Sequence, residues 1–154
     1  MELPKRKRIR LEGFDYASSG GYFVTMCLAG RRPLLWEDGQ GRGASPEAPP
    51  ELSRIGKIVE QEIRRWNGLF KQVRIDPYQI MADHVHLVIF IEAGGEEPPP
   101  TLSRMVQQFK GAVTKRVGFS IWQKSFYDHV IRNDESYLGV WRYIDENPLQ
   151  EREP

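Results

Sequence analysis

Two histidines stand on either side of a single valine in the stretch MADHVHLVIF, residues 81–90. The residues that follow them are apolar, which is typical of a buried strand. Because side chains alternate along a strand, His84 and His86 should point to the same face, about 7 Å apart along the chain. Two imidazoles at that spacing can reach one divalent ion, and added oxygen donors would let such a site take Mg²⁺ or Mn²⁺. The plainer alternative is a pair of histidines that hydrogen-bond to neighbouring side chains.

A second spacing points to phosphoryl chemistry. Tyr143 and Asn147 are four positions apart in an expected helix, so they share one helical face. A tyrosine hydroxyl can act as a nucleophile, and an amide oxygen can serve as a third metal ligand. Taken singly, Tyr143 would be a packing aromatic, and Asn147, which precedes Pro148, would mark the end of the helix. Their combination with two strand histidines favours a metal-assisted site.

Three other residues compete for roles in that chemistry. Tyr137 lies near the start of the expected last helix and has no asparagine at the matching spacing. Tyr127 lies on an expected strand, two residues before His129. His129 is either a structural residue or a fourth ligand or acid–base group.

The hydrophobic patterns predict strands at residues 20–29, 73–81, 84–92 and 125–133, and helices at about 51–68, 101–117 and 134–147. At Pro77 the second strand is expected to bend or to lie partly at an edge of the sheet, and Pro148 is expected to end the last helix. The first six elements follow the ferredoxin-like, split βαβ order. The sequence therefore predicts an α+β fold: a four-stranded antiparallel sheet, two helices on one face, and an extra C-terminal helix, carrying the tyrosine, for the other.

Length and composition indicate one domain over residues 1–154, with a basic arm at 1–12 and loops at 37–50 and 93–100. No apolar run reaches the roughly 18 residues of a membrane span, so no membrane contact is expected. The single cysteine, Cys27, cannot form an internal disulfide and favours a reducing compartment. The formal net charge of +1 disfavours a protein that coats DNA by charge alone.

Local clusters of positive charge can still hold a phosphate backbone. The basic arm is either a DNA contact or a solubilising tail, and the later cations, Arg142 among them, are either a DNA channel or a solvated surface. Trp122 and Phe126 are expected in the core, with stacking on unpaired bases as the alternative. The candidate DNA-binding residues are Lys5, Arg6, Lys7, Arg8, Lys110, Lys115, Arg116 and Arg132.

These motifs resemble the single-tyrosine HUH transposases, in which two histidines flank a hydrophobic residue. MADHVHLVIF resembles their Met-Pro-Asn-His-Val-His block, with Ala82-Asp83 in place of Pro-Asn. Three further blocks resemble the branch of REP-associated tyrosine transposases: KRIRLEGFDYASSGGYFVTMCLAGRRPLL, QQFKGAVTKRV and IWQKSFYDHVIRNDESYLGVWRYIDENPLQ. The four blocks keep the same order and span about residues 7–150.

The resemblance implies an enzyme that cuts and rejoins single-stranded DNA at hairpin-forming, REP-like repeats through a 5′-phosphotyrosine intermediate. It implies Tyr143 as the nucleophile and His84, His86 and Asn147 as ligands of Mg²⁺ or Mn²⁺. It also implies a cytoplasmic, nucleoid-associated protein, and it leaves a monomer or a homodimer open. The alternatives are a hairpin-binding module that does not cleave, a replication initiator or relaxase with the same chemistry, and a small metal-binding structural protein.

Overall fold

The computed structural model describes residues 20–39, 50–92 and 99–152, with side chains described as far as Ile144. Most of the two predicted loops and the side chain of Asn147 lie outside the described part. So does the whole basic arm, with Lys5, Arg6, Lys7 and Arg8.

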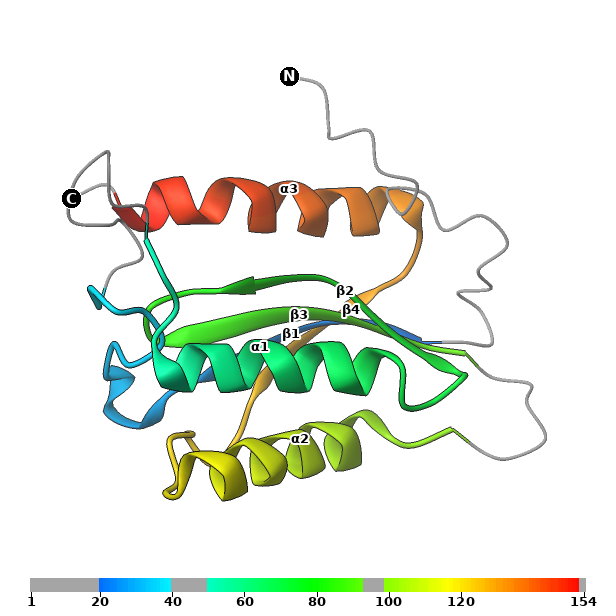
Figure 1. The fold of residues 1–154 in the computed structure, drawn as a ribbon. Helices are drawn as coiled ribbons and strands as arrows, with labels where there is room; N and C mark the ends of the chain where they lie inside the picture. Colours follow the sequence, from blue (N-terminus) through cyan, green and yellow to red (C-terminus); the bar gives the residue numbers. More distant parts are fainter. Residues whose placement is uncertain (1–19, 40–49, 93–98, 153–154) are drawn as a thin grey trace.

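Four strands form one antiparallel sheet in the order β2-β3-β1-β4. The strands are β1 (Gly20–Cys27), β2 (Val73–Ile80), β3 (His84–Ile91) and β4 (Tyr127–Ile131). The helices are α1 (Arg54–Asn67), α2 (Leu102–Val117) and α3 (Asp134–Arg152), with a short 3₁₀ helix, η2 (Ala29–Arg31). Helices α1 and α2 cover one face of the sheet and α3 lies across the other (Figure 1). The predicted ferredoxin-like α+β fold is confirmed, including the extra helix on the second face.

Strand β3 is buried along its whole length, because it is a central strand with helices on both sides. Its odd-numbered residues, from Val85 to Ile91, belong to the cluster under α1 and α2. On the other side, Val88 and Phe90 belong to the cluster under α3. Burial on two sides explains why the strand reads as a continuous apolar run and not as an alternating one.

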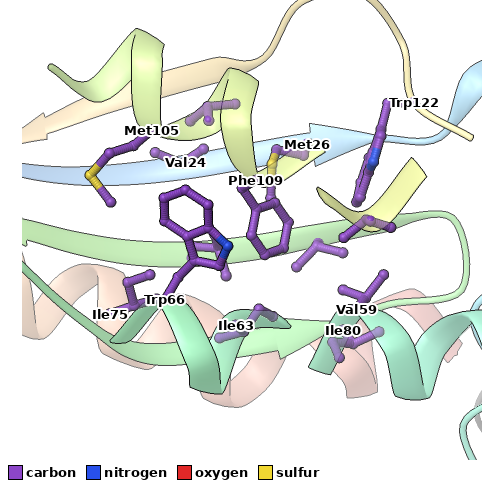
Figure 2. Packing of buried hydrophobic residues seen from close by; sticks show 14 of the residues in the cluster. Val24, Met26, Val59, Ile63, Trp66, Ile75, Ile80, Met105, Phe109 and Trp122 are labelled. Carbon is purple, nitrogen blue, oxygen red and sulfur yellow. The ribbon is translucent and has the colours of Figure 1, made fainter. Parts of the chain in front are cut away.

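The larger core lies between the sheet and the helices α1 and α2, where Trp66 and Phe109 project toward Met26 of β1 (Figure 2). Trp122 belongs to this core, and its ring lies 6.2 Å from that of Phe109. Phe126 packs against the same cluster. The structure therefore confirms the prediction that Trp122 and Phe126 pack in the core.

The smaller core attaches α3 to the sheet. Tyr137 and Trp141 are almost completely buried, and the Tyr137 ring lies edge-on to Phe90 at 5.3 Å. Tyr137, Trp141 and Ile144 are spaced four and three residues apart, so they lie on one face of the helix. The cluster comprises Val88, Phe90, Ile131, Tyr137, Val140, Trp141 and Ile144, with Phe23 packed against it.

Some predicted element ends were wrong. Strand β1 was predicted to reach residue 29 but ends at Cys27, because the chain turns there into the 3₁₀ helix η2. Helix α3 continues through Pro148 to Arg152, although an interior proline removes one backbone hydrogen bond and crowds the carbonyl four residues earlier. The irregularity expected at Pro77 is present as a register shift between Ile75 and Tyr78.

A buried carboxylate clamps α1 to α2. The side chain of Glu62 is only 4% exposed, and its oxygens accept hydrogen bonds from Arg65, Trp66 and Arg116 at 3.0–3.2 Å. Burial would raise the pKa of Glu62, but the bonds from Arg65 and Arg116 outweigh burial and lower it below 4.5. Glu62 is therefore ionised at neutral pH and contributes to holding the two helices together.

Glu62→Gln should lower the free energy of unfolding by about 1–3 kcal/mol at neutral pH, because it removes the charge that Arg65 and Arg116 share. A lowered folded-state pKa stabilises the protein above the ordinary value of 4.5 and loses that contribution as pH falls through the folded value. Urea unfolding of the unaltered protein and of Glu62→Gln should therefore show a difference in the free energy of unfolding that becomes smaller as the pH falls below 4.5. Glu51→Gln, at an exposed position, is the control and should change stability by less than about 0.5 kcal/mol. A gap independent of pH would contradict the assignment.

Candidate active site

The two histidines of β3 lie on the face that α3 covers. The alternation that directs Val85 and Leu87 toward α1 and α2 directs His84 and His86 the other way. In the sheet, His86 is paired with Gln79 of β2 and with Thr25 of β1, while His84 is paired with the buried Cys27. The predicted common face is confirmed.

Both imidazoles are buried, each 4% exposed, and their rings lie edge to face with centroids 4.7 Å apart. The His86 Nδ1 atom is 2.9 Å from the Thr25 hydroxyl oxygen. Burial, together with the nearby His84, lowers the pKa of His86 to about 3. His86 is therefore neutral at physiological pH, the form in which an imidazole can bind a cation.

His84 is held by an acidic neighbour. Its Nδ1 atom is 2.7 Å from Asp83 Oδ1, and Asp83 Oδ2 accepts a 2.8 Å hydrogen bond from Arg31 Nε. Burial would raise the pKa of Asp83, but the bonds with Arg31 and His84 lower it overall. Because the Nδ1 atoms of both histidines are hydrogen-bonded, any ion bound between these rings would be held through Nε2.

Helix α3 brings a tyrosine to this pair. The Tyr143 ring lies 5.6 Å from the His86 ring and 5.7 Å from that of Phe23, edge-on to both. Tyr143 is nevertheless 45% exposed. A partly solvated phenol beside two buried imidazoles can be reached by a substrate from outside.

The competing tyrosines are placed less well for chemistry at the histidines. Tyr137 is fully buried in the smaller core. Tyr127 is 64% exposed and shares the face of His86, but Thr25 of β1 stands between them in the sheet. His129 is likewise on β4, two strands from β3 and hence about 10 Å away across the sheet.

The direction in which α3 crosses the sheet decides where Asn147 lies relative to the histidines. Tyr137 contacts Phe90 and Tyr143 contacts His86, so the helix runs antiparallel to β3, toward its His84 end. The backbone of Asn147 lies in α3 one turn beyond Tyr143. Within the described residues no three His, Cys, Asp or Glu side chains gather where they could hold a metal. Two imidazoles would therefore need oxygen donors of another kind, such as an amide, water or phosphate.

The predicted DNA-binding cations Lys110, Lys115 and Arg116 belong to α2, which covers the face of the sheet opposite α3 (Figure 1). Lys110 Nζ donates to the carbonyl oxygens of Gln123 and Ser125, at 2.9 and 2.8 Å. Arg116 pairs with Glu62, and Lys115 is exposed. Lys110 and Arg116 thus have structural partners, which sequence patterns alone did not reveal.

Two other predicted cations are exposed. Arg142 precedes Tyr143 in α3, whereas Arg132 follows β4 at the end of the sheet where Ile131 pairs with Gly21, away from His84 and His86. Sequence reasoning missed Thr25, whose pairing with His86 has no local signal. It noted Asp83 only as a departure from a motif and missed its partner, Arg31.

None of the helices in the described part of the chain combines the length and apolar character needed to span a bilayer.

The chain is similar to known proteins in sequence and in fold. It is 31% identical, over 166 residues, to an uncharacterized protein of Haemophilus influenzae strain Rd, covering 94% of this chain and 88% of that protein. No family model matches the chain.

Two solved structures share the fold. One is a REP-associated tyrosine transposase bound to a REP hairpin, with a TM-score of 0.65 and 21% identity over 99% of this chain and 75% of that one. The other is a candidate transposase from Deinococcus radiodurans R1, with a TM-score of 0.52 and 15% identity over 89% of this chain and 95% of that one. The chain therefore belongs to the same family as the Haemophilus influenzae protein, and its fold is similar to that of the REP-associated tyrosine transposase.

Proposed function

We propose that this protein is a transposase or nickase that cleaves and rejoins single-stranded DNA at hairpin-forming repeats, with Tyr143 as the nucleophile. One observation carries the proposal: an accessible phenol lies edge-on to a buried, neutral imidazole that belongs to a pair. The fold adds support, since a neighbour with the same fold is a tyrosine transposase bound to a REP hairpin.

The donor set fits a divalent ion in part. The Nε2 atoms of His84 and His86 would hold Mn²⁺ or Mg²⁺, and these ions also accept water and phosphate oxygens as ligands. We propose His84, His86 and Asn147 as the protein ligands. Such an ion would offset the charge that builds up on the phosphate in the transition state and orient it for attack.

Tyr143 then carries the covalent chemistry. Its oxygen forms a bond to phosphorus while the bond from phosphorus to the 3′-oxygen breaks, which leaves a 5′-phosphotyrosine. The phenol proton passes to solvent, since the side chain is partly exposed, and the departing 3′-oxygen takes a proton from water. A free 3′-hydroxyl can reverse the step without an external source of energy, because the phosphodiester bond is exchanged and not hydrolysed.

The phosphate backbone needs positive contacts on the side of the sheet where Tyr143 lies. We propose Arg132 and the basic arm, residues Lys5 to Arg8, for that role. Lys110, Lys115 and Arg116 would meet DNA only where a hairpin extends past the sheet to α2. The proposal implies a protein that acts on the chromosome in the cytoplasm, as a monomer or as a homodimer in which Tyr143 serves the partner's site.

Tyr143→Phe should reduce cleavage of a labelled single-stranded hairpin by about three orders of magnitude or more, because it removes the attacking oxygen and little else. Tyr127→Phe, at an exposed tyrosine on the same sheet face, is the matched control and should cleave normally. Denaturing gels would measure cleavage, and mass spectrometry would locate the phosphotyrosine. A covalent adduct on Tyr127 would contradict the assignment. Binding without cleavage by the unaltered protein would favour a hairpin-binding module.

His86→Ala should lower the cleavage rate in Mn²⁺ by at least about 100-fold, since it removes a proposed ligand. Chelation of the ion should abolish cleavage, and added Mn²⁺ should restore it. His129→Ala is the control, because this histidine is exposed and lies two strands away. Equal losses in the two variants would show that histidine placement does not decide activity. Full activity in the chelator would contradict the metal-assisted mechanism.

A further inference from the structure

We propose that Asp83 and Arg31 form a positioning pair that holds the His84 ring in one orientation and one tautomer. The proposal rests on the proposed function, because it assigns the pair a task at the ion-binding end of that site. Asp83 is also the residue at which the motif departs from the asparagine of the transposases that it resembles.

The carboxylate of Asp83 lies between the His84 ring and the Arg31 guanidinium and contacts both. One oxygen of Asp83 lies 2.7 Å from His84 Nδ1, and the other accepts a hydrogen bond from Arg31 Nε at 2.8 Å. A second guanidinium nitrogen of Arg31 lies 3.4 Å from Asp83 Oδ1, so the fork of Arg31 spans both carboxylate oxygens. The buried imidazole at the inner end contrasts with the largely exposed Arg31 at the outer end.

Backbone hydrogen bonds fix the segments that carry Asp83 and Arg31. The amide of Leu28 donates to the Asp83 carbonyl at 2.9 Å, and that of Leu35 donates to the Ala82 carbonyl at 3.2 Å. Arg31 has a φ of 53°, a left-handed conformation that non-glycine residues rarely adopt. That conformation is unfavourable for a residue with a Cβ atom, so the surrounding contacts must offset its cost. The segment that carries Arg31 is therefore fixed against the turn that carries Asp83.

The chemistry of the carboxylate decides the tautomer. An ionised carboxylate only accepts hydrogen bonds, so the His84 nitrogen that faces it must carry the proton. In the neutral form of an imidazole a proton on Nδ1 leaves Nε2 with its lone pair, and Nε2 is the nitrogen that would bind an ion. Carboxylate partners of metal-bound histidines act in this way, and their loss typically lowers metal affinity by about 10- to 100-fold.

The second histidine offers an internal comparison. His86 Nδ1 meets the hydroxyl of Thr25, which can either donate or accept. Thr25 therefore permits both tautomers of His86, whereas Asp83 enforces one at His84.

The test compares Asp83→Asn, which keeps an acceptor oxygen, with Asp83→Ala, which removes it. Long-range ¹H–¹⁵N NMR of the metal-free protein at neutral pH reports the tautomer of His84. We expect the Nδ1-protonated form in the unaltered protein, and mixed tautomers both in Asp83→Asn, whose amide can donate as well as accept, and in Asp83→Ala. Thr25→Val is the control and should leave the His84 tautomer unchanged. A single, unchanged tautomer in Asp83→Ala would overturn the proposal.

Binding of Mn²⁺, followed by its effect on water proton relaxation, gives a second readout. Affinity should fall about 10- to 100-fold in Asp83→Ala and only a few-fold in Asp83→Asn. Arg31→Met should fall between them, and it remains informative if Asp83→Ala does not fold. Equal affinities in all variants would contradict a positioning role. An unaltered protein that has the predicted tautomer but cleaves no DNA would contradict the proposed function and leave the positioning pair standing.

Discussion

The candidate site depends on the packing of α3 against the second face of the sheet. Tyr137 and Trp141 anchor the helix over Phe90, and burial of large apolar side chains such as these contributes about 1.5–3 kcal/mol each. Tyr143 has no comparable anchorage of its own, since it is 45% exposed. Its place beside His86 is therefore set by the buried residues of α3 on either side of it, from Tyr137 to Ile144.

Polar groups in a strand buried on both sides are energetically costly unless they are hydrogen-bonded. His84 and His86 meet that requirement through Asp83 and Thr25. An apolar pair would have been the simpler solution for packing alone. Such a local departure from the apolar pattern is what a functional site is expected to show.

The two faces of the sheet have different tasks. The face under α1 and α2 holds the larger core, and its charges serve stability, since Glu62 and Arg116 link the two helices. Lys110 likewise donates to two backbone carbonyls. The face under α3 holds the smaller core and the candidate site. This division explains why cations that look alike in the sequence differ in their availability to a phosphate.

The sequence by itself determined the fold class, the shared face of His84 and His86 and the buried stripe of α3, because local periodicity dictates which side chains lie together. It did not determine which tyrosine meets the histidines, since the direction of α3 over β3 depends on how the whole sheet is covered. Nor did it reveal the partners Thr25 and Arg31, which are 61 and 52 residues from the atoms they contact. Strand register and chain turns bring such residues together, and neither leaves a signal in the local pattern.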